Sequence, residues 1–224
     1  MIRRIGLAAA VLLVATSAPR AEEAPVPNAT DLLFSEPQLS ATKPGDVLTY
    51  SYSRKTADQA QYGPAFDDQI RLTVGKGGAD ATRTVDAELF SGARRRPAGP
   101  FSDMTGNPVL SLILEQNIEG LSTQLGGNPR YFKTAIRTAL RESAAVVPDT
   151  VQVGDRTEAA WRVSITPFKD DPNKARMRGL DTLTYQFEIA KAVPGEVLQI
   201  RISAPGLSGS PLLEERVDYV AKRD

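Results

Sequence analysis

Apolar and polar residues alternate with a period of two in seven separate segments of this 224-residue chain. In the clearest segment, residues 183–189, Leu183, Tyr185 and Phe187 alternate with polar residues. Because successive residues of a strand face opposite sides of a sheet, such a segment has one apolar and one polar face. Parallel strands that are buried on both sides are apolar throughout instead. The pattern therefore predicts an antiparallel sheet with one dry face and one wet face.

The seven segments form two groups along the chain. In order, they are residues 48–53, 69–74, 84–89, 161–166, 183–189, 198–203 and 217–221. The connections 75–78 and 193–196 are short and contain Gly or Pro, as hairpins require. The spacing predicts strands that follow one another as neighbours, with a longer insertion between the third and the fourth.

The inserted region has the apolar period of a helix. Asn107-Pro108 and Asn128-Pro129 each place a favourable N-cap residue before a proline that suits the first helical turn. Gly126-Gly127 supplies a stop for the first helix. The sequence therefore predicts an αα-hairpin, at about residues 108–125 and 129–145, inserted between strands 3 and 4 and packed on the apolar face. The predicted fold class is α+β, with a curved antiparallel sheet of about seven strands.

The first 21 residues have the anatomy of a secretory signal peptide. Arg3 and Arg4 precede an apolar run of 11 residues, Ile5–Ala15. As a helix, this run spans roughly 16 Å, about half of a bilayer's hydrocarbon core. We therefore expect export and no membrane span after the signal is removed, with the periplasm as the compartment and secretion as the alternative. Residues 22–30 are predicted to be a disordered leader and residues 31–224 a single domain.

The composition excludes several kinds of chemistry. The chain has no His and no Cys, so it has no imidazole base, no thiolate nucleophile and no zinc site of the usual ligands. Residues 1–21 hold three of the 27 basic residues, which leaves 24 basic against 27 acidic residues in the remainder. Nucleic-acid affinity requires a strongly basic face instead. We expect no enzyme activity, metal, cofactor or nucleic-acid partner.

The predicted sheet is wider than its helical cover. Seven strands span about 30 Å, whereas two helices cover about 20 Å. Soluble proteins seldom expose a large apolar patch, so four outcomes are open: the sheet curls around the helices, closes into a barrel, leaves a groove for an apolar ligand, or buries its excess against an envelope protein. An exported sheet of this kind around a helical insertion resembles the periplasmic lipoprotein-carrier fold in architecture, although a shared fold does not specify a function.

A groove between sheet and helices would be lined by the apolar faces of both. The residues predicted to line it are Tyr50, Tyr52, Leu110, Leu114, Ile118, Phe132, Ile136, Trp161, Tyr185 and Phe187. The main hypothesis is therefore an exported, soluble, non-enzymatic binding protein of the cell envelope. It would carry a lipid or another amphipathic ligand in this groove.

The segment 92–106 supports an alternative hypothesis. It is rich in Gly and Pro, and Arg94, Arg95 and Arg96 form a compact cationic cluster within it. Because the guanidinium fork suits phosphates and carboxylates, this predicted loop would contact an anionic head group or an acidic partner. The protein would then be an interaction or scaffold module with a fully packed core.

The charged faces of the two predicted helices hold the acids that a carboxylate-dependent hydrolase would need. Glu115 and Glu119 are one turn apart on the first helix, and the second helix carries a basic stripe of Arg130, Lys133, Arg137 and Arg141. Ion pairs between the helices, or two solvated faces, explain both features. A carboxylate-dependent hydrolase is the remaining interpretation, and it requires several acids to converge in one cleft.

Overall fold

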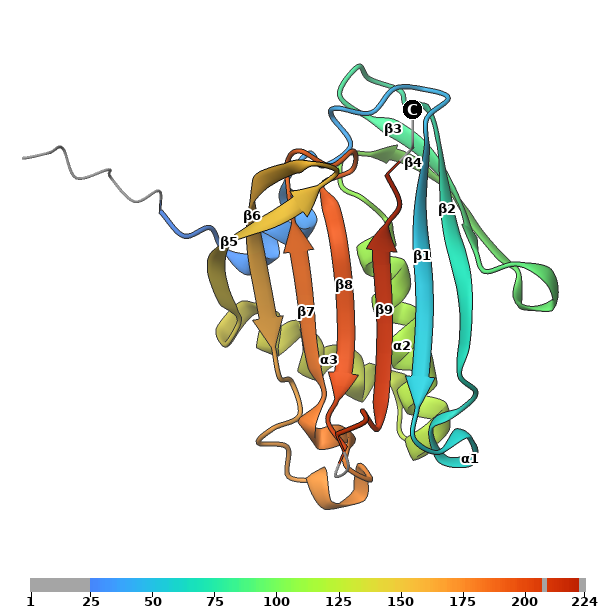
Figure 1. Cartoon of the computed structure of the whole chain (residues 1–224), viewed down its shortest axis with the longest axis vertical. Coiled ribbons are helices and arrows are strands. Elements are labelled where there is room, and N and C mark those ends of the chain that lie inside the picture. Colours follow the sequence, from blue (N-terminus) through green and yellow to red (C-terminus); the bar gives the residue numbers. More distant parts are fainter. Residues whose placement is uncertain (1–24, 207–208, 222–224) are drawn as a thin grey trace, which may run out of the picture.

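The protein has an α+β fold, in which one antiparallel sheet carries a pair of helices on one face (Figure 1). In this computed structural model the described residues are 25–206 and 209–221. The predicted signal peptide and the first part of the predicted leader lie outside them. Ala29, near the end of the predicted leader, is buried in the core.

The sheet has nine strands in the spatial order β4-β3-β2-β1-β9-β8-β7-β6-β5. The strands are β1 (Val47–Thr56), β2 (Phe66–Lys76), β3 (Arg83–Leu89), β4 (Arg96–Met104), β5 (Ala145–Val153), β6 (Arg156–Ile165), β7 (Thr184–Ile189), β8 (Val197–Ala204) and β9 (Leu213–Tyr219). All neighbours pair antiparallel, and the β1–β9 pair joins the two halves of the chain.

Helical segments precede and connect these strands. They are the π-helical turn η1 (Asp31–Ser35), the short α1 (Gln59–Tyr62), the 3-10 turns η2 (Gly92–Arg94), η3 (Lys174–Arg176) and η4 (Leu180–Thr182), and the long helices α2 (Val109–Leu125) and α3 (Pro129–Glu142). The helices α2 and α3 form the pair on the sheet and lie between β4 and β5 in the chain.

The seven predicted strands are present, but the expected number is too low by two. The missing strands, β4 and β5, are the two edges of the sheet. β4 lies in the segment predicted as a loop and contains Pro97 and Pro100, while β5 contains Pro148. Proline lacks the N–H that a central strand needs and is therefore confined to edges or bulges. The helix pair consequently lies between β4 and β5, not between strands 3 and 4 of seven.

Both predicted helix starts are confirmed. The Asn107 side chain accepts a hydrogen bond from the Val109 N–H at 3.1 Å, and the Asn128 side chain accepts one from the Arg130 N–H at 2.9 Å. α3, however, ends at Glu142 instead of residue 145. The segment Ala145–Val153 is extended because it contains β-branched valines and because the residue before Pro148 is disfavoured in a helix.

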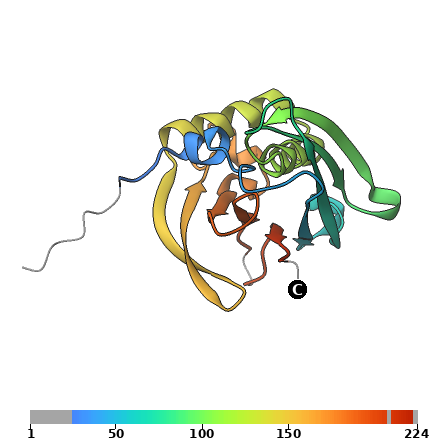
Figure 2. The ribbon, with the colours of Figure 1, turned by 90° about the horizontal axis from the view of Figure 1, so that it is seen from above.

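The sheet curves around the helices (Figure 2). This curvature removes much of the expected difference in width between the sheet and the helix pair. Segments outside the helix pair complete the cover. Leu32, Leu33 and Leu39 enter the core from the N-terminal segment, and Phe168 and Met177 enter it from the β6–β7 connection. The core between sheet and helices is therefore continuous.

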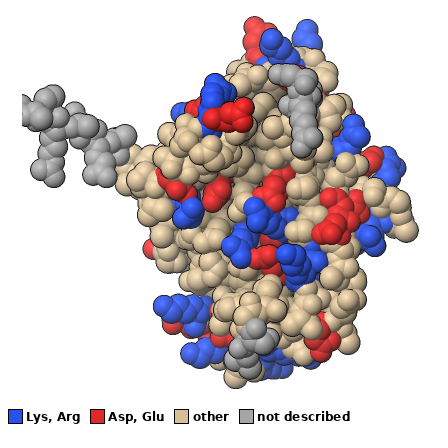
Figure 3. All heavy atoms as spheres, in the orientation of Figure 1, with Lys and Arg blue, Asp and Glu red and all other residues tan. Residues whose placement is uncertain are grey.

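The opposite face of the sheet is mostly polar and carries interspersed charges of both signs (Figure 3). Cross-strand pairs such as Arg201 with Glu214, at 2.9 Å between Nε and Oε2, connect neighbouring strands there. One small apolar cluster of Val151, Ala160, Ala190 and Val193 interrupts this face. The predicted alternation thus describes the central strands but not β4 or the region of the β5–β6 hairpin.

Candidate functional site

The candidate site is a groove between α2, α3 and η1, with a volume of about 580 Å³. We call it the interhelical groove, and it is lined by Thr30, Phe34, Ser111, Leu114, Glu115, Ile118, Lys133, Ile136, Arg137, Leu140 and Arg141. The residues from α2 are spaced at i, i+3, i+4 and i+7, so they share one helix face. Those from α3 follow the same rule, and two facing helical stripes therefore form the walls.

The floor of the interhelical groove is apolar. Leu114, Ile118, Ile136 and Leu140 are each at most 8% exposed, because their side chains also pack into the core. Phe34 lies at the groove on η1 and is 38% exposed. It is one of the few large apolar side chains among the described residues that remain this accessible. The groove thus offers an apolar surface that a ligand can cover.

The rim of the interhelical groove is charged and mainly cationic. Lys133 of α3 forms an ion pair with Glu115 of α2, which connects the two walls. Arg137 and Arg141 are exposed on the α3 side. The lining therefore holds three cations and one carboxylate, and an amphipathic ligand fits its combination of apolar floor and charged rim.

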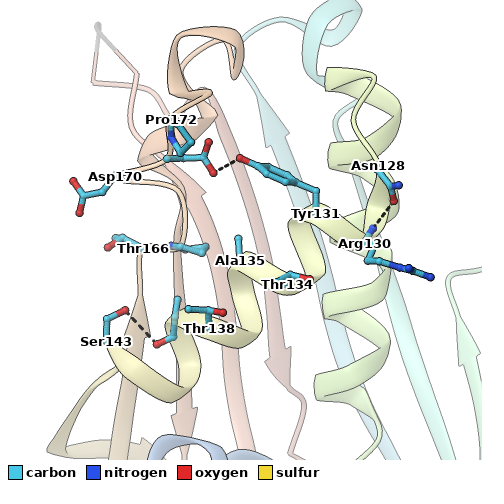
Figure 4. Close-up of a pocket in the computed structure, with 13 residues that line it drawn as sticks. Asn128, Arg130, Tyr131, Thr134, Ala135, Thr138, Ser143, Thr166, Asp170 and Pro172 are labelled. Carbon is cyan, nitrogen blue, oxygen red and sulfur yellow. Dashed lines mark hydrogen bonds between the residues drawn. The ribbon is translucent and has the colours of Figure 1, made fainter.

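A second hollow of about 650 Å³ lies on the other side of α3, against the β6–β7 connection (Figure 4). Its α3 wall consists of short side chains such as Thr134, Ala135 and Thr138. Tyr131 reaches across one end and donates a hydrogen bond to Asp171. The rest of its lining includes two prolines and two aspartates, and this hollow lacks the two facing helix stripes that form the walls of the interhelical groove.

The ten residues predicted to line a groove between sheet and helices do not lie together in one groove. Tyr50, Tyr52, Leu110, Tyr185 and Phe187 are at most 1% exposed and belong to the closed core. A ligand beside them would require the helix pair to move away from the sheet.

The other five of these residues lie nearer the surface of the helix layer or at the margin of the core. Leu114, Ile118 and Ile136 line the interhelical groove. Phe132 lines a smaller hollow beside the α2–α3 turn, and Trp161 is half-buried on β6. The structure thus brings three of the ten predicted residues together at the candidate site.

Two buried hydrogen-bond networks hold Tyr50 and Tyr185 in the core. The Asn107 Nδ2 donates to the Tyr50 hydroxyl at 2.8 Å, and the Tyr185 hydroxyl donates to the Asn117 Oδ1 at 2.7 Å. Burial raises the pKa of both tyrosine hydroxyls. These hydroxyls tie the sheet to the N-terminal end and the middle of α2, so the tyrosines act as anchors of the helix layer.

The three arginines of the predicted loop do not form a free cationic cluster. Arg94 lies 4.5 Å from the centre of the Phe66 ring and 3.6 Å from Asp68. The Arg95 Nε donates to Glu88 at 2.7 Å, and Arg96 lies 3.6 Å from Glu119 on α2. Each of the three side chains is oriented by a different carboxylate, although all three remain more than half exposed.

Several residues that line the interhelical groove are not among the ten that the sequence predicts. Ser111 and Leu140 continue the two apolar helix stripes, and helical spacing from Leu114 and Ile136 points to them. The basic stripe supplies Lys133, Arg137 and Arg141, which the sequence pattern marks only as ion-pairing or solvated. Thr30 and Phe34 come from a segment without periodicity, and no sequence signal indicates them.

Among residues 25–206 and 209–221, no three acidic side chains gather as they would around a metal ion. Within the part of the chain that the structure describes, no helix has both the length and the apolarity needed to cross a bilayer.

Comparisons with known proteins find remote similarity among solved structures. No protein-family model matches the sequence, and no curated protein matches it. Among solved structures, the chain is similar to the lipoprotein LppX of Mycobacterium tuberculosis, with 12% sequence identity and a TM-score of 0.33. The match covers 82% of this chain and 90% of that one.

Proposed function

We propose that this chain is an exported, non-enzymatic binding protein of the cell envelope that holds an amphipathic ligand in the interhelical groove. The observation that carries the proposal is the groove itself, with an apolar floor and a charged rim on one face of the helix pair. Its volume of about 580 Å³ lies within the range of roughly 300–1,000 Å³ that is usual for ligand sites. The N-terminal sequence supports export.

The groove lies on the outside of the helix layer, which differs from the sheet–helix groove expected from the sequence. The core beneath α2 is closed by large side chains such as Tyr185 and Phe187. A ligand in the interhelical groove leaves that core intact and covers Phe34, which is otherwise accessible to water. Burial of that apolar surface provides a driving force for binding.

The acidic residues support a binding role in preference to hydrolysis. The two acids first considered for catalysis lie one turn apart on α2, and each is beside a basic side chain of its own. Glu115 pairs with Lys133, and Glu119 lies near Arg96. General acid–base chemistry at a single cleft requires such groups to converge on one substrate.

The test is a titration with three ten-carbon probes that differ only in head group: decanoate, decyl phosphate and uncharged decyl glucoside, each below its critical micelle concentration. Isothermal titration calorimetry measures their affinities for the mature protein. The blocking variant is Ser111→Trp, because Ser111 is exposed and lines the groove. The matched control is Thr123→Trp, at another exposed position of α2 outside the groove.

We expect Ser111→Trp to weaken the binding of every probe by at least about tenfold, or roughly 1.4 kcal/mol. Thr123→Trp should bind the probes as the unmodified protein does. Circular dichroism and thermal unfolding establish that both variants fold. The proposal is wrong if no probe binds, or if both tryptophan variants bind equally well.

A further inference from the structure

The interhelical groove has more positive than negative charge, and two of its cations are unpaired within the described residues. Arg137 and Arg141 are one helical turn apart on α3, so both guanidinium groups project from the same face. Among residues 25–206 and 209–221, neither has a carboxylate within 4.0 Å. The single acid of the lining, Glu115, is already paired with Lys133.

This situation differs from that of the three arginines at the start of β4 and in the turn before it. Arg94, Arg95 and Arg96 each lie near a carboxylate of their own. In contrast, the positive charge of Arg137 and Arg141 is uncompensated beside an apolar floor. An arginine fork forms two parallel hydrogen bonds with a carboxylate or phosphate, which makes this pair suited to an anionic head group.

The end of the groove formed by the N-terminal segment provides a second observation. The Thr30 hydroxyl oxygen is shielded from solvent and forms no hydrogen bond with the described residues. Thr30 lines the same groove as Arg137 and Arg141. A buried hydroxyl without a partner is unfavourable, and an oxygen-rich head group at this end of the groove would give it one.

We infer that the ligand of the interhelical groove is an anionic amphiphile, whose carboxylate or phosphate head group is bound by Arg137 and Arg141 and whose chain lies on the apolar floor. This inference rests on the proposed function and specifies the chemical class of its ligand. Leu114 and Ile118 on α2 and Ile136 on α3 contact the chain. Lys133 remains engaged with Glu115 and keeps the two walls connected.

The experiment uses the same three ten-carbon probes, because they share one chain and differ in head-group charge. The test variant is the double substitution Arg137→Gln/Arg141→Gln, which keeps hydrogen-bonding side chains but removes both charges. The matched control is Arg130→Gln, on the same helix and also exposed, but outside the interhelical groove. A third variant, Thr30→Val, removes only the hydroxyl.

We expect decanoate and decyl phosphate to bind at least about tenfold more tightly than decyl glucoside, with a preference that shrinks as salt is added. The double variant should lose this preference and still bind decyl glucoside within about twofold of the unmodified protein. Arg130→Gln should keep the preference. Comparison of the two anions shows whether the pair favours a carboxylate or a phosphate.

Failure of the head-group inference and failure of the proposed function give different results. If all three probes bind equally and the double variant changes nothing, the head-group inference is overturned, while blocking by Ser111→Trp still supports an amphiphile in the groove. If none of the probes binds, the proposed function itself fails. Retention of the anion preference by the double variant also overturns the inference. For Thr30→Val, weaker binding of the anions alone supports a head group at that end, and unchanged binding contradicts it.

Discussion

Arg54 Nη1 lies 2.7 Å from Glu215 Oε1 in the core, where the two side chains are only 8% and 2% exposed. Arg54 Nη2 also donates to the Tyr62 carbonyl at 2.6 Å. On the other carboxylate oxygen, Glu215 accepts a hydrogen bond from Asn117 Nδ2 of α2 at 3.3 Å, and Asn117 in turn accepts one from Tyr185. This network joins β1, β7 and β9 to the helix that forms one wall of the interhelical groove.

Replacing Arg54 by Met should strongly destabilise the fold. The substitution keeps an apolar stem but leaves Glu215 as a buried carboxylate without its cation, and breaking such pairs typically costs about 3–5 kcal/mol. Urea denaturation measures the free energy of unfolding. Arg95→Met is the control, because the Arg95–Glu88 pair is exposed and screened by solvent. Equal effects of the two substitutions would contradict a structural role for the buried pair.

The stability contributed by Glu215 should depend on pH. Burial raises the pKa of this carboxyl above its ordinary value of 4.5, against the opposing effects of Arg54 and of hydrogen bonds from neighbouring side chains. The folded state therefore keeps the proton to higher pH than the unfolded state does. The favourable contribution is complete below about pH 4.5 and is lost as the pH rises through the folded-state pKa.

Glu215→Gln removes this titration and provides the comparison. We expect the free energy of unfolding of the unmodified protein, relative to that of the variant, to fall as the pH rises above 4.5 and to be level below it. The neighbouring Tyr52 and Tyr185 hydroxyls stay protonated in this range because burial raises their pKa values. Urea denaturation at a series of pH values checks the prediction, and a constant difference would rule it out.

The central strands were predictable because one face of each is buried in the core and the other is wet. For β7, every second residue from Tyr185 onward is buried, as the alternation requires. The edge strands were not predictable in this way. β4 and β5 pair on one side only, tolerate Pro97, Pro100 and Pro148, and have irregular burial, so their sequences are typical of loops.

The candidate site was predictable only in part. Leu114, Ile118 and Ile136 belong to amphipathic stripes, which are visible in the sequence. The interruption of the α2 stripe by Asn117 is a signal that a buried polar contact lies there, and it favours a closed core around Tyr185. The contribution of η1 depends on tertiary packing of Phe34 against the helix pair and has no local pattern.

Asn107 should contribute more to stability than the other helix-capping asparagine. Its Nδ2 donates to the Tyr50 hydroxyl at 2.8 Å and to the Gly195 carbonyl at 2.9 Å, in addition to the cap at Val109. Asn107→Ala leaves these buried groups unpaired, and we expect a loss of about 2–4 kcal/mol. Asn128→Ala, at an exposed cap, should cost about 1 kcal/mol. Urea denaturation distinguishes them, and similar losses would contradict the prediction.

Gly195 should tolerate alanine much less well than Gly154 does. Both glycines have a left-handed backbone, with φ values of +77° and +62°. A Cβ at Gly195 would lie 2.7 Å from both Asn107 Nδ2 and Leu48 Cδ1, whereas a Cβ at Gly154 would have no neighbour within 4 Å. Each substitution carries a backbone cost of about 1 kcal/mol.

The comparison therefore isolates packing at the turn between β7 and β8. Because the new methyl group disturbs Asn107 and its hydrogen bonds, we expect Gly195→Ala to lose at least about 1–3 kcal/mol more than Gly154→Ala. The midpoints and slopes of urea denaturation measure the difference. If the two variants lose the same stability, the close approach of Gly195 to Asn107 and Leu48 does not constrain this turn.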